Sequence, residues 1–83
     1  MNVSLADVLL ARERLRSAVP PSPLVRLDVE GDAEIWLKLE NLQPIGSFKL
    51  RGAGNALLAA PPDQLREGAV TASAGNMAQG VAW

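Results

Sequence analysis

Lys49 is the residue of this sequence whose surroundings are best suited to covalent chemistry. The loop before it contains Pro44 and Gly46, and Ser47 is expected to cap a helix in which Lys49 is the second residue. There the amine lies at the positive end of the helix dipole, which disfavours its charged form. Because a neutral lysine amine attacks carbonyl groups to make Schiff bases, the pattern indicates a nucleophile. The alternative interpretation is an ordinary solvated lysine near a helix start.

A second segment, residues 71–76, has the chemistry of a binding loop. A small apolar strand is expected to run into Ser-Ala-Gly-Asn at a helix start, where free backbone N–H groups bind carboxylate or phosphate. In α/β sheets, ligands sit at the carboxyl ends of strands. Asn76 adds an amide that both donates and accepts hydrogen bonds. The alternative is a plain helix start, with Ser73 as its N-cap and Gly75 easing the turn.

The elements that must position these two segments follow from hydrophobic spacing and from the prolines. Ser4 and Asp7 predict a capping box at the start of an amphipathic helix, and Pro20 lies where that helix must have ended. The predicted elements are a helix over 4–18, strands over 24–27 and 34–39, a helix that follows Ser47 and runs to about Ala60, a short helix over 63–66, a buried parallel-type strand over 69–72 and a last helix from about 76. This alternation of strands and helices predicts a βαβ unit and a parallel sheet.

Four residues near the lysine have more modest expected roles. Gly52 and Gly54 lie inside the expected Lys49 helix, where each costs about 1 kcal/mol relative to alanine, so close approach of a sheet or a ligand is expected there. Glu40 is interpreted as a capping or turn residue. Arg51 is not expected to pair with Lys49, because side chains at i and i+2 of a helix do not face each other.

Composition bounds the class of protein. The chain has 83 residues, a net charge of −1, no histidine and no cysteine, which predicts one small domain at most and no metal site. Nothing in this charge attracts nucleic acid or an anionic membrane. A signal-peptide pattern and an apolar run of roughly 20 residues are both lacking, so a soluble, cytoplasmic protein is predicted. The last expected helix begins without a stop signal, which indicates a truncated chain.

Two motifs taken together resemble the threonine/serine dehydratases, fold-type II enzymes that depend on pyridoxal 5′-phosphate (PLP). Residues 38–53 are similar to the family's cofactor-lysine motif and read Lys-Leu-Glu-Asn-Leu-Gln-Pro-Ile-Gly-Ser-Phe-Lys-Leu-Arg-Gly-Ala. Residues 73–82, Ser-Ala-Gly-Asn-Met-Ala-Gln-Gly-Val-Ala, are similar to its Ser-x-Gly-Asn-His-Ala-Gln-Gly segment. Residues 22–27 look like its Thr-Pro-Leu strand, and the resemblance extends over residues 4–83.

The resemblance implies an α/β fold of the tryptophan synthase β type, a parallel sheet with flanking helices, of which residues 1–83 form only the N-terminal part of a domain. It implies that Lys49 holds PLP as an internal aldimine and then removes the α-proton of the substrate, with PLP as the electron sink. Phe48 is expected to pack near the cofactor ring, and Asn76 to bond its phenolic oxygen. The residues expected to grip the substrate carboxylate are Ser73, Ala74, Gly75, Asn76 and Met77.

Two details of the motifs favour β-elimination. Leu50 follows the lysine where cysteine and threonine synthases of this fold usually have Asp, which favours the dehydratase and racemase branch. Ala74 stands where serine racemases tend to carry a second serine, which favours release of a 2-oxo acid and ammonia from L-threonine or L-serine. A serine racemase, another amino-acid lyase of this fold and a non-catalytic truncated product are the alternatives.

The sequence also departs from the family pattern. Met77 replaces the usual His, and Ile45 stands where Thr is common. The resemblance places the glycine-rich phosphate loop beyond position 83, so the 83-residue chain alone is expected to bind PLP weakly and to catalyse little. The expected partner is a small amino-acid substrate, and the full-length protein is expected to be a homo-oligomer.

Overall fold

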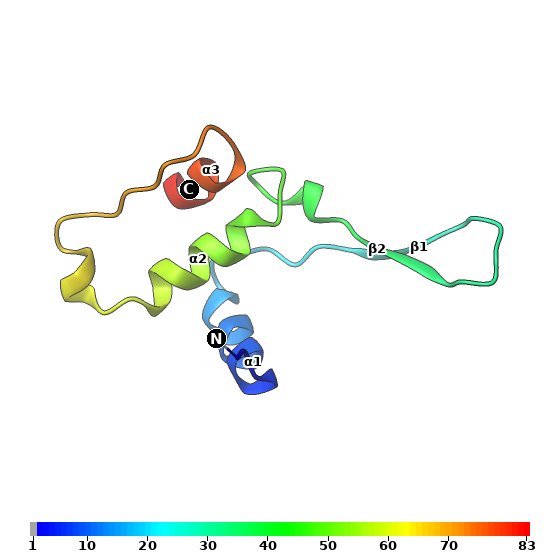
Figure 1. Ribbon diagram of the computed structural model, residues 1–83, viewed down its shortest axis with the longest axis horizontal. Coiled ribbons are helices and arrows are strands. Elements are labelled where there is room, and N and C mark those ends of the chain that lie inside the picture. Colours follow the sequence, from blue (N-terminus) through cyan, green and yellow to red (C-terminus); the bar gives the residue numbers. More distant parts are fainter. Residues whose placement is uncertain (1) are drawn as a thin grey trace.

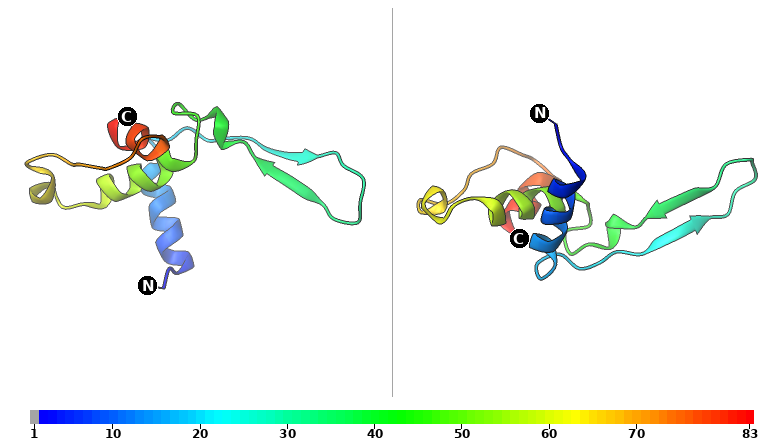
Figure 2. Two further views of the ribbon diagram at one scale, coloured as in Figure 1. Left: turned by 45° about the horizontal axis from the view of Figure 1, so that its top comes forward. Right: turned by 90° about the horizontal axis from the view of Figure 1, so that it is seen from below.

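The computed structural model describes residues 2–83 and consists of helices around one central helix, with a separate hairpin. Its elements are α1 (Leu5–Leu15), β1 (Leu24–Leu27), β2 (Ile35–Lys38), the 3-10 helix η1 (Glu40–Leu42), α2 (Lys49–Ala59), the 3-10 helix η2 (Pro62–Leu65) and α3 (Asn76–Ala82). Helices α1 and α3 lie on opposite sides of α2 (Figure 1). In every view the β1–β2 hairpin extends away from the helices (Figure 2). No helix within residues 2–83 is long and apolar enough to cross a membrane.

The predicted capping box begins α1. The Asp7 N–H donates to Ser4 Oγ at 3.2 Å, and the Ser4 N–H donates to Asp7 Oδ2 at 2.8 Å. Each bond satisfies an N–H group that has no partner inside the helix, which confirms this prediction. The helix ends at Leu15, earlier than predicted, and the next residues form turns in which the Ala18 N–H donates to Leu15 O at 3.0 Å. Pro20 has no N–H to donate to the carbonyl four residues earlier, at position 16, and its ring clashes with that carbonyl, which disfavours continuing the helix.

Strands β1 and β2 pair antiparallel, with Leu24 opposite Lys38 and Leu27 opposite Ile35. The parallel sheet predicted from the sequence is therefore wrong for the part of the chain that the structure describes. The short connection over residues 28–34 turns the chain straight back, whereas parallel strands need a crossover of a dozen residues or more. Every residue of both strands is exposed, so neither face of the hairpin is part of the core.

The strand predicted over residues 69–72 is also wrong. The segment has no strand partner in residues 2–83, and Val70 is fully exposed. A β-strand exists only where a neighbouring strand completes its hydrogen bonds, and the hairpin lies on the other side of the helices (Figure 1). Apolar, β-branched composition is therefore not sufficient to form a strand at this position.

The core joins the end of α1 to the start of α2. Leu15, Val19 and Leu50 are buried, and Leu50 is the most deeply placed at 2% exposure. Ala18 and Ile45 pack against these three side chains. The apolar cluster therefore fixes the first turn of α2, which carries Lys49, against the N-terminal helix.

The two interior glycines of α2 behave differently. A Cβ atom at Gly54 would lie 3.1 Å from Leu15 Cδ2, so the small residue allows the close approach of helix α1, where a sheet or a ligand was predicted. A Cβ atom at Gly52 would meet nothing within 4 Å, so the predicted close approach is wrong there for the described residues.

Candidate functional site

Lys49 is the first residue of α2, one position nearer to the helix start than predicted. The N-cap is Phe48, whose backbone is already helical, and not Ser47. Ser47 Oγ still accepts a hydrogen bond from the Lys49 N–H, at 3.4 Å. Before it, the Gly46 N–H donates to Gln43 O at 2.8 Å, and Gly46 has a φ of 73°, a left-handed conformation that favours glycine. This tight turn places Lys49 at the start of α2.

Lys49 is a half-buried residue whose amine lies close to an aromatic ring. Within residues 2–83 no carboxylate forms an ion pair with Lys49. Its Nζ atom lies 5.4 Å from the centroid of the Phe48 ring, and Phe48 is 61% exposed. At an exposed site such a contact is worth only about 0.5–1 kcal/mol. The amine is therefore held loosely over an aromatic ring and not locked in a salt bridge.

Gly80 brings the second sequence motif to Lys49. It is buried in α3, and a Cβ atom there would lie 3.1 Å from Lys49 O and 3.2 Å from Ala53 Cβ. Helix α3 therefore packs directly against the first turn of α2. Asn76 begins α3 one turn before Gly80, on the same face of the helix. The structure thus joins the two motifs that were separate in the sequence.

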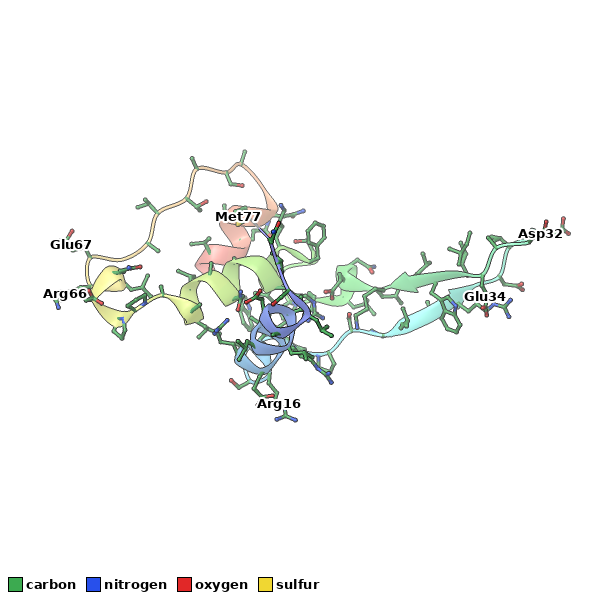
Figure 3. All side chains as sticks on the ribbon, turned by 60° about the horizontal axis from the view of Figure 1, so that its bottom comes forward. Arg16, Asp32, Glu34, Arg66, Glu67 and Met77 are labelled. Atoms are coloured by element: carbon green, nitrogen blue, oxygen red, sulfur yellow. The ribbon has the colours of Figure 1, made fainter. Side chains whose placement is uncertain are left out.

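The loop before α3 is exposed, as a binding loop must be. Residues 73–76 are exposed and Met77 is half-buried. Figure 3 places Met77 on the α3 side of the molecule, away from Arg16 on the α1 side. Ser73 was the predicted N-cap in the plain-helix interpretation, but Gly75 occupies that position. Ser73 Oγ instead accepts a hydrogen bond from the Gly75 N–H at 3.2 Å. The Ser73 hydroxyl therefore stabilises the loop before α3 and does not cap the helix.

Sequence reasoning missed a polar network that joins the loop before α2 to the first turn of that helix. Both Nε and Nη2 of Arg51 donate to the Glu40 carboxylate, the latter at 3.3 Å. Gln43 Nε2 donates to Glu40 Oε2 at 2.8 Å. The Arg51 guanidinium lowers the pKa of Glu40 from 4.5 to about 2, and the Gln43 amide acts in the same direction, against the opposing effect of partial burial. Because eleven positions of irregular chain and helix separate the partners, no spacing rule points to the pair.

A groove of about 720 Å³ lies between α1 and α2. Its lining includes Arg12, Leu15 and Gly52, and it includes none of Phe48, Lys49 and residues 73–77. The groove is therefore not formed by the residues that the motifs single out. Those residues lie instead at the junction of α2 and α3.

Comparison with known proteins identifies the family. Residues 15–83 match the family model described as pyridoxal-phosphate dependent enzyme. The chain is 45% identical to the biosynthetic L-threonine dehydratase of Corynebacterium glutamicum, over 98% of this chain and 19% of that protein. It is 42% identical to the L-threonine ammonia-lyase of Thermotoga maritima, over 96% of this chain and 21% of that protein.

A third relative is an ammonia-lyase that is named for a different substrate. The chain is 45% identical to the L-threo-3-hydroxyaspartate ammonia-lyase of a Pseudomonas species, over 95% of this chain and 26% of that protein. The chain therefore belongs to the pyridoxal-phosphate dependent enzymes, as the motifs indicated, and PLP is the cofactor of this family. It spans about a fifth to a quarter of the length of these relatives.

The groups at the junction of α2 and α3 fit PLP in their chemistry. PLP offers an aldehyde, an aromatic ring and a phenolic oxygen. The matching groups are the Lys49 amine, which no carboxylate in residues 2–83 binds, the ring of Phe48 and the side-chain amide of Asn76, and both of the latter residues are exposed. Amine, ring and amide come from two segments that the Gly80 contact holds together.

Proposed function

We propose that this chain supplies part of the active site of a PLP-dependent ammonia-lyase that acts on L-threonine or L-serine. The reaction removes the α-proton and the β-hydroxyl of the amino acid as water, and hydrolysis then gives a 2-oxo acid and ammonia. The observation that carries the proposal is the contact between Gly80 and the Lys49 carbonyl, which unites the lysine motif with the Ser73–Asn76 loop. Residues 1–83 are proposed to form only the N-terminal part of the catalytic domain.

Each site residue has a distinct proposed role. Lys49 Nζ holds the cofactor through its aldehyde carbon and, once displaced by the substrate amine, removes the proton from the substrate Cα. PLP, when bound, supplies the electron sink that makes this proton acidic. Phe48 packs against the cofactor ring, and the amide of Asn76 donates to the phenolic oxygen.

The substrate carboxylate is proposed to bind the loop of residues 73–77. Backbone N–H groups there can donate to it, and residues 73–76 are exposed. Met77, in place of the family's usual His, has no side-chain donor and contributes through its backbone. Ala74 offers no hydroxyl as a second acid or base, so protonation from the opposite face is disfavoured and elimination prevails over racemisation.

The test is a chimera in which residues 1–83 replace the matching segment of the Corynebacterium dehydratase. The chimera should release 2-oxo acid and ammonia from L-threonine, and Lys49→Ala should abolish this release. Lys38→Ala is the matched control, because Lys38 is the only other lysine in the sequence. With L-serine the chimera should form pyruvate without D-serine. Retained activity in the Lys49→Ala chimera, or D-serine as the main product, would contradict the proposal.

A further inference from the structure

The Glu40 carboxylate is surrounded by donors from two elements. It is 14% exposed, and it accepts hydrogen bonds from the guanidinium of Arg51 on α2 and from the Gln43 amide in the loop before α2. Bonds to a charged carboxylate are about twice as strong as neutral ones. Glu40 therefore links the end of the hairpin region to the first turn of the Lys49 helix.

Gln43 extends this link to a third segment. This residue is 5% exposed, and its Nε2 also donates to Pro20 O at 2.8 Å. Its backbone carbonyl accepts the hydrogen bond from the Gly46 N–H that closes the turn before Lys49. The loop of residues 40–48 is thus tied to α2 at one end and to the chain after α1 in its middle.

We propose that Glu40 is a positioning residue for Lys49, which acts through Arg51 and Gln43 to hold the loop of residues 40–48 in the conformation that presents the Lys49 amine to the aldehyde of PLP. The inference rests on the proposed function, since it assumes that Lys49 is the residue that bonds PLP. It assigns a role to a residue that does not itself touch the cofactor.

The test measures where PLP bonds to the 83-residue chain. Bonding of Nζ to the aldehyde carbon releases one water, and added borohydride donates hydride to fix the product as a secondary amine. Digestion and mass spectrometry then give the ratio of label on Lys49 to label on Lys38. Lys38 is the internal reference, because its Nζ donates to Ser22 O at 2.6 Å and forms no ion pair with Glu40 in the described residues.

Glu40→Gln and Arg51→Gln should each lower the Lys49-to-Lys38 ratio by about tenfold, the effect of losing one charge-assisted contact. The charge-exchanged variant with Glu40→Arg and Arg51→Glu together should restore the ratio, which a loss of folding would not do. Glu13→Gln is the matched control, because it breaks the exposed pair with Arg16 on α1 and should leave the ratio unchanged.

Three results would count against the inference or against the proposed function, and they can be told apart. A Lys49 preference in the wild type that survives Glu40→Gln unchanged, with unchanged helix content by circular dichroism, refutes positioning by Glu40 and leaves the proposed function standing. Equal labelling of Lys49 and Lys38 in the wild type counts against the proposed function itself. If Glu40→Gln also loses helix content, its lower labelling ratio could come from unfolding, and the charge-exchanged variant is then the decisive one. If that variant does not regain the wild-type ratio of label on Lys49 to label on Lys38, the inference is refuted.

Discussion

The substitution Gly80→Ala tests the contact that unites the two motifs. The added methyl group would lie 3.1 Å from Lys49 O and 3.2 Å from Ala53 Cβ. A backbone carbonyl inside a helix cannot rotate away as the end of a flexible side chain can. Helix α3 must therefore move away from α2, and the loop of residues 73–77 must move with it.

Two opposing effects determine the free energy of this substitution. Replacing glycine by alanine inside a helix stabilises it by about 1 kcal/mol. Overpacking a close contact costs about 1–3 kcal/mol. Overpacking is the larger effect because the obstructing atom is main chain, so we expect a net destabilisation of about 1 kcal/mol. Urea denaturation followed by circular dichroism at pH 7 measures this difference.

Gly52→Ala is the matched control for Gly80→Ala. It is the same chemical change inside a neighbouring helix, but a Cβ atom at Gly52 would meet nothing within 4 Å. It should stabilise the chain by about 0.5–1 kcal/mol. The two glycine substitutions should therefore have opposite signs. If Gly80→Ala stabilises the chain as much as Gly52→Ala does, α3 does not pack on α2 and the union of the two motifs is refuted.

The remaining predictions concern the Glu40 carboxylate and the core. Because the pKa of Glu40 is lowered from 4.5 to about 2, its stabilisation is complete above about pH 4.5 and is lost as the pH falls towards 2. The urea midpoint of the wild type should fall across this window more steeply than that of Glu40→Gln, and parallel pH profiles would contradict the ion pair. Leu50→Ala should cost about 2–5 kcal/mol, because Leu50 is 2% exposed at the centre of the core. Leu10→Ala, at an exposed position of α1, is its control, and equal losses in the two variants would show that the core lies elsewhere.

Local signals predicted the local structure well. Ser4 and Asp7 predicted the capping box because both of its bonds join residues three positions apart. The helix that begins at Lys49 was predicted to within one residue at its start, since a turn glycine precedes it and prolines follow it. Such features depend on few neighbouring residues and can therefore be predicted from the sequence.

Features that depend on residues far apart in the sequence could not be predicted from it. The direction of strand pairing and the unpaired segment 69–72 depend on which other strands are present, and composition does not report this. The Glu40–Arg51 pair depends on the path of the loop between the two residues. The motifs singled out Lys49 and the Ser73–Asn76 loop, but only the packing of Gly80 shows that they meet.

The measurement that tests the central claim most directly is the site of borohydride-fixed PLP on the wild-type chain, read by peptide mass spectrometry. The sequence has only two lysines, Lys38 and Lys49, so the result is unambiguous. We predict label predominantly on Lys49, and loss of that label together with the visible absorbance of bound PLP in Lys49→Ala but not in Lys38→Ala. Label divided equally between the two lysines, or a Lys49→Ala chain that still acquires the visible band, would contradict this prediction.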